Sequence, residues 1–171
     1  MRVYIPATIA MLRQLVDERE LSPVSRTAFA VTPALREAYH SGDDDELSEV
    51  AMAEAARASL RLIAAAAPED GGDGAAPHHR RAVIAADVED VKLRPDLDDA
   101  VVRLADVVRL AQVASVHVDL AEAEPDVEKA VAAVDAADLG DEDAEFVLGD
   151  AEDHELAWYA TQELPFLLEL L

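Results

Sequence analysis

The chain has 171 residues, a formal net charge of −23 at pH 7 and no cysteine. Its length suits a single globular domain over residues 1–171 that can bury its own core. Without cysteine, disulfides, thiolate catalysis and cysteine-based zinc sites are excluded. Because so negative a surface repels phosphate backbones and anionic lipids, we expect no direct binding to nucleic acid or to membranes.

Apolar residues make up 51% of the chain but aromatic residues only 4%, so the core should consist mainly of alanine, valine and leucine. No stretch approaches the roughly 18 apolar residues that a membrane span requires. The N-terminal segment contains Pro6 and lacks the small-residue cleavage site of a signal peptide. We therefore expect a cytoplasmic protein.

The N-terminal part of the chain alternates strand-like runs with stretches of helical periodicity. Thr8 and Thr32 each precede a helical stretch and suit helix N-caps, and Pro33 suits a first helical position. From the spacing of the apolar residues we expect strands at 3–5 and 27–31, and helices at 9–19, 33–40 and 45–67. Residues 68–79 contain three glycines and no periodicity, which predicts a mobile surface loop.

Residues 80–90, RRAVIAADVED, contain a continuous apolar run that is bounded by charge at both ends. Such a run is typical of a strand covered on both faces, so we expect a strand at 81–88 at the centre of the sheet. The fold class is predicted to be α+β, with α/β as the alternative. The expected architecture is a mixed sheet of four to five strands with helices packed against it.

Residues 97–112 carry two conflicting patterns. Their apolar residues recur at helical spacing, whereas the valine pairs at 101–102 and 107–108 favour a strand. We favour a strand, because a helix there would leave the sheet with too few strands. The alternation in 113–120 predicts another strand, and a helix should follow at 125–138.

The C-terminal part of the chain is the most acidic, because residues 121–171 hold sixteen acids and Lys129 as the only base. A short apolar island at 146–148 lies within it. The tail at 156–171 is rich in leucine, and we expect it to dock onto the core, since it would otherwise expose a large apolar patch. Three of its leucines fit an LxxLL interaction motif, but burial in the same chain is the commoner role of such residues: Leu164, Leu167 and Leu168.

Ser115, His117 and Asp119 are the residue types of a hydrolase triad. On a strand they share one face, but neighbours on that face lie roughly 6.6 to 7 Å apart along the chain. A catalytic hydrogen bond requires about 2.6 to 3.2 Å, so we expect the three to be too far apart to work alone. His117 and Asp119 are then catalytic candidates only in a pocket at the strand ends that other elements complete.

Tyr4, Trp158 and Tyr159 are the candidate binding residues, because a large aromatic side chain can line a ligand pocket or an interface. No metal site and no cofactor is predicted.

Four segments, MRVYIPAT, AFAVTPALRE, SVHVDL and HELAWYATQEL, resemble an uncharacterised actinobacterial protein family, a domain of unknown function. The resemblance spans the whole chain and implies a single cytoplasmic domain. The family has no known activity, so the resemblance assigns no functional residue.

Three functions are compatible with the sequence. The first is a non-enzymatic interaction or regulatory module that uses the acidic C-terminal region or the apolar tail, with a basic protein or a second copy of the chain (a homodimer) as partner. The second is a small enzyme or ligand-binding protein with a pocket at the strand ends. The third is an acidic DNA mimic, which requires carboxylates ordered on one rigid face.

Overall fold

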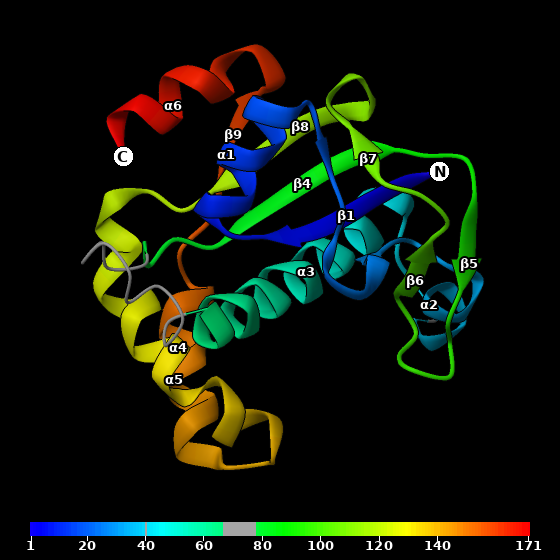
Figure 1. Ribbon diagram of the computed structural model, residues 1–171. Coiled ribbons are helices and arrows are strands. Elements are labelled where there is room, and N and C mark those ends of the chain that lie inside the picture. Colours follow the sequence, from blue (N-terminus) through cyan, green and yellow to red (C-terminus); the bar gives the residue numbers. More distant parts are fainter. Residues whose placement is uncertain (40, 67–77) are drawn as a thin grey trace.

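A computed structural model describes residues 1–39, 41–66 and 78–171 (Figure 1). Most of the loop predicted at 68–79 lies outside these described residues. The α-helices among them are α1 (Ile9–Glu18), α2 (Pro33–Ala38), α3 (Asp44–Ala66), α4 (Glu124–Asp138), α5 (Glu142–Glu152) and α6 (Leu164–Leu170). The strands are β1 (Arg2–Ala7), β2 (Glu20–Leu21), β3 (Thr27–Phe29), β4 (Ala82–Asp87), β5 (Val91–Leu93), β6 (Val101–Leu104), β7 (Val108–Arg109), β8 (Val113–Val118) and β9 (Ala157–Ala160).

The main sheet has seven strands in the order β5-β6-β3-β1-β4-β8-β9, and every neighbouring pair is antiparallel. A separate pair joins β2 to β7. The α+β class is thus confirmed, whereas the predicted mixed sheet of four to five strands was wrong. The additional strands β5 and β9 have only three and four residues, too few to show a period of their own, and their partners in the sheet define them.

β1 and β4 form the middle of the sheet, with six paired positions from Arg2↔Asp87 to Ala7↔Ala82. The side chains of residues 82–86 in β4 are at most 1% exposed, which confirms that both faces of this strand are covered. By strand order the central strand is β1, and β4 lies beside it. The centre of the sheet is therefore formed by β1 together with β4. For β1 the sequence pattern predicted only residues 3–5.

Helices cover the two faces of the sheet (Figure 1). α1 and α6 pack on one face, where the C-terminal leucines join the largest apolar cluster, which confirms that the tail is docked. α3 crosses the other face and packs against β1, β3 and β4. The second half of α3 packs in turn against α4 and α5, which form a third cluster beyond the sheet.

Helix positions follow the sequence patterns closely. The predicted helices at 9–19, 33–40, 45–67 and 125–138 correspond to α1, α2, α3 and α4 within two residues at each end. Both threonine caps are present, because Thr8 accepts a hydrogen bond from the amide of Met11 and Thr32 accepts one from Leu35. Residues 97–112 contain β6 and β7, so the choice of strand over helix is confirmed. No helix in the described ranges is both long and apolar enough to cross a membrane.

Ser59 connects the middle of α3 to the ends of two central strands. Its fully buried Oγ donates a hydrogen bond to the carbonyl oxygen of Ala7 (2.7 Å) and accepts one from the amide of Ala82 (3.1 Å). The helix is thereby fixed to the last residue of β1 and the first residue of β4.

We expect Ser59→Ala to lower the free energy of unfolding by about 1–3 kcal/mol, because it leaves a buried carbonyl and a buried amide unpaired. Urea denaturation measures the change. Ser48→Ala is the matched control, since Ser48 donates only to the carbonyl of Asp44 at an exposed position of the same helix, and its effect should stay within about 0.5 kcal/mol. Equal losses in the two variants would contradict the bridging role of Ser59.

Candidate functional site

α4 and α5 form an acidic hairpin that extends away from the sheet (Figure 1). Between 121 and 153 the hairpin region holds thirteen carboxylates and a single basic residue, Lys129. Gly140, with φ +97°, makes the left-handed turn after α4, and Asp141 caps α5 by accepting a hydrogen bond from Ala144 at 3.0 Å. Acidic side chains in the first turn of each helix favour its positive dipole end. Local sequence therefore forms the hairpin.

The inner side of the hairpin is apolar and packs against Leu60 of α3. The residues that form this contact are small or branched and almost fully buried: Val127, Ala130, Val134, Ala144, Leu148 and Ala151. Their burial fixes which sides of α4 and α5 face outward.

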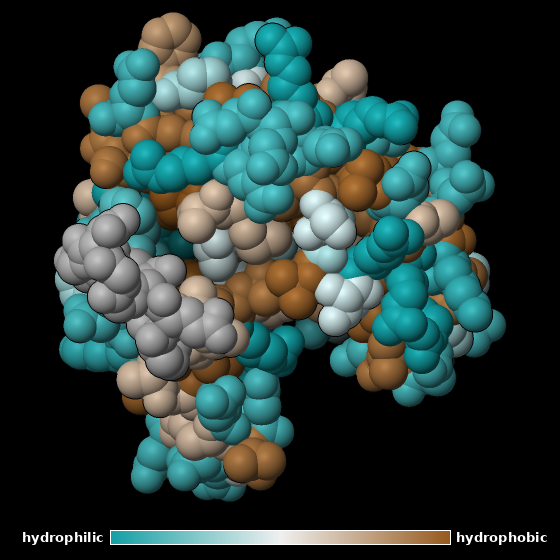
Figure 2. Space-filling model, viewed as in Figure 1, coloured by the Kyte–Doolittle hydropathy of each residue, from teal (hydrophilic) through white to brown (hydrophobic). Residues whose placement is uncertain are grey.

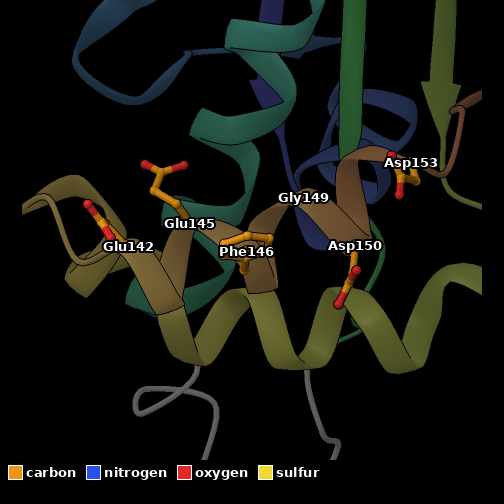
Figure 3. A pocket seen from close by; sticks show the side chains of 6 residues that line it. All are labelled: Glu142, Glu145, Phe146, Gly149, Asp150 and Asp153. Atoms are coloured by element: carbon orange, nitrogen blue, oxygen red, sulfur yellow. The ribbon is translucent and has the colours of Figure 1, made fainter.

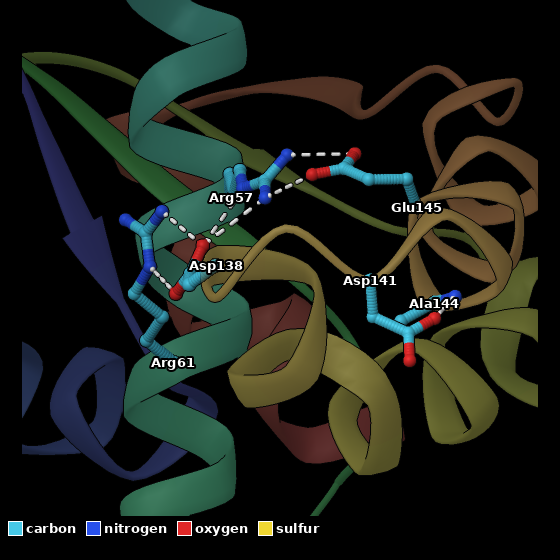
Figure 4. A network of polar contacts seen from close by, with 6 residues as sticks. All are labelled: Arg57, Arg61, Asp138, Asp141, Ala144 and Glu145. Carbon is cyan, nitrogen blue, oxygen red and sulfur yellow. Dashed lines mark hydrogen bonds and ion pairs between the residues drawn. The ribbon is translucent and has the colours of Figure 1, made fainter.

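An ion-pair network holds the hairpin to α3 (Figure 4). Arg61 donates to Asp138 at 2.7 Å, while Arg57 donates to both Asp138 (3.1 Å) and Glu145 (2.7 Å). The hydrogen bond from Arg61 is the main cause that lowers the pKa of Asp138, and the bond from Arg57 lowers the pKa of Glu145. The same contacts raise the pKa of Arg57. The network thus connects the last residue of α4 and the first turn of α5 to one side of α3.

This network predicts a loss of stability in acid. Because the pKa of Asp138 is lowered by folding, its contribution is fully present above the unfolded value of about 3.9 and is lost as the pH falls through the folded value. Urea midpoints measured between about pH 6 and pH 2 should therefore fall more steeply for the unmodified protein than for Asp138→Asn. Parallel curves for the two proteins would show that the network contributes nothing.

The outer face of α5 is a shallow acidic depression with an aromatic ring at its middle (Figure 3). Phe146 is 80% exposed, and Gly149, one turn further, has no neighbour within 4 Å of where a side chain would begin. Carboxylates lie on both sides of the ring along the helix. We call this surface the α5 face: Glu142, Glu145, Phe146, Gly149, Asp150 and Asp153.

Hydrophilic side chains dominate the view in Figure 2, but a hydrophobic patch appears at the lower end of the hairpin. Leu139, which is 89% exposed, lies in the turn at that end. Large apolar side chains are thus exposed at two places on the most acidic part of the chain.

The α5 face follows a helical spacing of three and four residues that is visible in the sequence. The sequence indicated an apolar island at 146–148 but did not show which of its side chains are buried and which are exposed. In the structure Leu148 is fully buried whereas Phe146 points outward, because only one side of α5 packs on α4 and α3. If residues 142–153 had been predicted as one helix, the helical spacing would have placed Phe146 on the same face as the carboxylates.

Ser115 and His117 project from the same face of β8, and Ser115 Oγ lies 3.0 Å from His117 Nε2. The strand spacing predicted too large a separation for this one pair, because side chains can lean toward each other along a strand. Burial, and secondarily the charge of Arg2, lowers the pKa of His117, so its imidazole is neutral near pH 7. The Ser115 side chain is itself buried, and among the described residues no carboxylate is hydrogen-bonded to His117.

Asp119, the third residue of that set, lies in a different environment. It is completely buried and accepts hydrogen bonds from the Nε, the Nη2 and the backbone amide of Arg81, each at 2.8 Å. Arg81 also donates to the carbonyl oxygen of His154 at 2.9 Å. The carboxylate is therefore engaged in a structural ion pair and does not orient His117.

The three candidate aromatic residues do not converge. Tyr4 is buried in the cluster under α3, and Tyr159 packs on the opposite face of the sheet. Trp158 pairs with His117 in register and is 61% exposed on the edge strand β9. β1 and β9 are three strand positions apart, so the strands that carry Tyr4 and Trp158 are separated by about 14 Å. Within the described ranges no three histidine, aspartate or glutamate side chains are grouped so that they could hold a metal ion.

Comparison with known proteins identifies a family and no activity. A family of unknown function, DUF6912, matches residues 1–168. No curated protein and no solved structure matches the chain. The match covers nearly the full length and agrees with the resemblance carried by the four segments from 1 to 164. The chain therefore belongs to the family of unknown function DUF6912.

Proposed function

We propose that this protein is a non-enzymatic interaction module that binds a basic protein segment through the α5 face. The observation that carries the proposal is Phe146, an aromatic ring 80% exposed between carboxylates on a helix that is itself held to α3. Aromatic residues, phenylalanine among them, are enriched at the cores of protein–protein interfaces relative to the rest of the surface. The surrounding charge selects a partner of the opposite sign and accelerates encounter.

Rigidity supports the proposal. The inner side of the hairpin is buried, and the arginines of α3 hold both of its helices through Asp138 and Glu145. Little conformational entropy is then lost when a partner binds. A partner suited to this face is a helix or loop that places an apolar contact on Phe146 and lysine or arginine around it.

The charge of the chain favours a basic partner over a second copy. Two copies that each carry −23 repel one another, whereas a basic segment is attracted. The same face also distinguishes this function from a DNA mimic, because a mimic requires carboxylates alone and Phe146 offers a contact that phosphates do not. We further propose an actinobacterial origin and a cytoplasmic location, which the segment resemblance and the cysteine-free composition support.

The test is capture of partners by the full chain and by its Phe146→Ala variant, followed by binding measurements with each purified partner. We expect the full chain to capture a protein that has a basic segment. The Phe146→Ala variant should bind this partner about tenfold more weakly or worse, as expected for a residue at the centre of an interface. Its affinity should also fall steeply as salt is raised from about 0.05 to 0.5 M.

Phe166→Ala is the matched control, since Phe166 is 69% exposed on α6, away from the hairpin. A partner that binds both alanine variants equally would refute the assignment of the α5 face. A dimeric mass in solution that does not change with salt would instead favour the homodimer.

A further inference from the structure

A second concave site lies between α3, β8 and the segment that leads from α5 to β9. It is a cavity of about 440 Å³, within the usual size range of small-ligand sites. α3 supplies most of the apolar residues that line it, and Leu156 packs against the same apolar cluster as α3. The floor is apolar: Met52, Ala53, Ala56, Leu60 and Leu156.

Three glutamates from different elements lie at the edge of this cavity: Glu49 of α3, Glu152 of α5, and Glu155 in the following segment. All three are exposed, and none forms an ion pair with another described residue. The cavity edge therefore carries negative charge that the chain itself leaves uncompensated.

The cations that line the cavity are already neutralised. Arg81 pairs with the buried carboxylate of Asp119, and Arg57 pairs with Asp138 and Glu145. The imidazole of His154, which also lines the cavity, is engaged by Asp126 at 2.8 Å. His117 also lines the cavity, and burial keeps its imidazole neutral. An anionic ligand would meet three carboxylates and no available cation, so the cavity selects a positively charged group.

We propose that this cavity binds a primary alkylammonium group, with its aliphatic chain on the apolar floor and its ammonium paired with a glutamate at the edge. An ammonium group is a hydrogen-bond donor only, and its hydrogen bonds to carboxylates are charge-assisted. Two sources carry this group: a free polyamine, and the lysine side chain of a protein. The inference concerns a different site from the α5 face and does not depend on the protein partner proposed for that face.

The experiment is isothermal titration calorimetry of the full chain with two probes, spermidine and the blocked peptide acetyl-Ala-Ala-Lys-Ala-Ala-amide. Saturable binding of spermidine identifies a polyamine site, and preference for the peptide identifies a lysine site. With either probe, Glu152→Gln should weaken binding about tenfold or more, because it removes a charge-assisted hydrogen bond. Ala53→Trp should weaken it comparably without any change of charge, since Ala53 is exposed on α3 and lines the cavity.

Glu89→Gln is the control of equal charge, because Glu89 is exposed and lies beyond the opposite end of β4. Equal weakening by Glu89→Gln and Glu152→Gln would mean that the amine is only a counterion of an acidic chain, and would overturn the proposal. Absence of binding by both probes would do the same. Phe146→Ala should leave the binding of both probes unchanged. Failure of the cavity proposal can therefore be distinguished from failure of the proposal that the α5 face binds a protein.

Discussion

Replacing Asp119 with asparagine should lower the free energy of unfolding by about 3–5 kcal/mol, the largest effect that we expect of a single polar substitution in this chain. The side chains of Asp119 and Arg81 are 0% and 4% exposed, and the carboxylate accepts three hydrogen bonds from Arg81. Asparagine leaves the guanidinium buried without its counter-charge. Urea denaturation, with the slope checked for two-state behaviour, measures the loss.

Asp87→Asn is the matched control, because Asp87 pairs with Arg2 by two similar hydrogen bonds but with side chains 60% and 47% exposed. Solvent screens that pair, so its loss should cost about 0–1 kcal/mol. The double variant Arg81→Met with Asp119→Leu should recover most of the stability, since it removes both buried charges together. A cost below about 1 kcal/mol for Asp119→Asn would contradict the structural role assigned to this pair.

Truncating Leu148 to alanine should destabilise the protein by about 2–5 kcal/mol, because the residue is fully buried where α5 meets α3 and α4. The lost methyl groups leave a cavity that the packed helices fill only partly. Thermal and urea unfolding measure the cost. Hydrogen exchange should rise first in α5, whose inner side depends on this contact.

Phe146→Ala provides the contrast within two residues of the same helix. Since the Phe146 ring is 80% exposed, its removal should change stability by no more than about 0.5 kcal/mol. The two variants therefore separate folding from binding: Leu148→Ala affects the hairpin itself, and Phe146→Ala affects only its outer face. Comparable destabilisation by both would show that the ring is packed in solution and would remove the basis for the proposed interface.

The candidate site was only partly accessible to sequence reasoning. The sequence predicted one strand at 113–120 containing both His117 and Asp119, whereas β8 ends at Val118 and Asp119 follows it. The contacts of Asp119 depend on Arg81, 38 residues earlier in the chain. The hydrogen bond between Ser115 and His117 depends on side-chain orientation, which strand spacing does not fix. For the α5 face, composition revealed the acidity, whereas the exposure of Phe146 required knowing which side of the helix is buried.

The sequence by itself determined the features that rest on neighbours in the chain. Apolar periodicity and threonine caps located α1 to α4, and a continuous apolar run located β4, because helix formation and strand burial leave patterns a few residues long. Only the tertiary structure decided the seven-strand order, the Arg81–Asp119 pair and the outward direction of Phe146. These features join segments that are far apart in the sequence. Strand pairing, ion pairing and helix rotation are selected by the free energy of the assembled core, which no local pattern records.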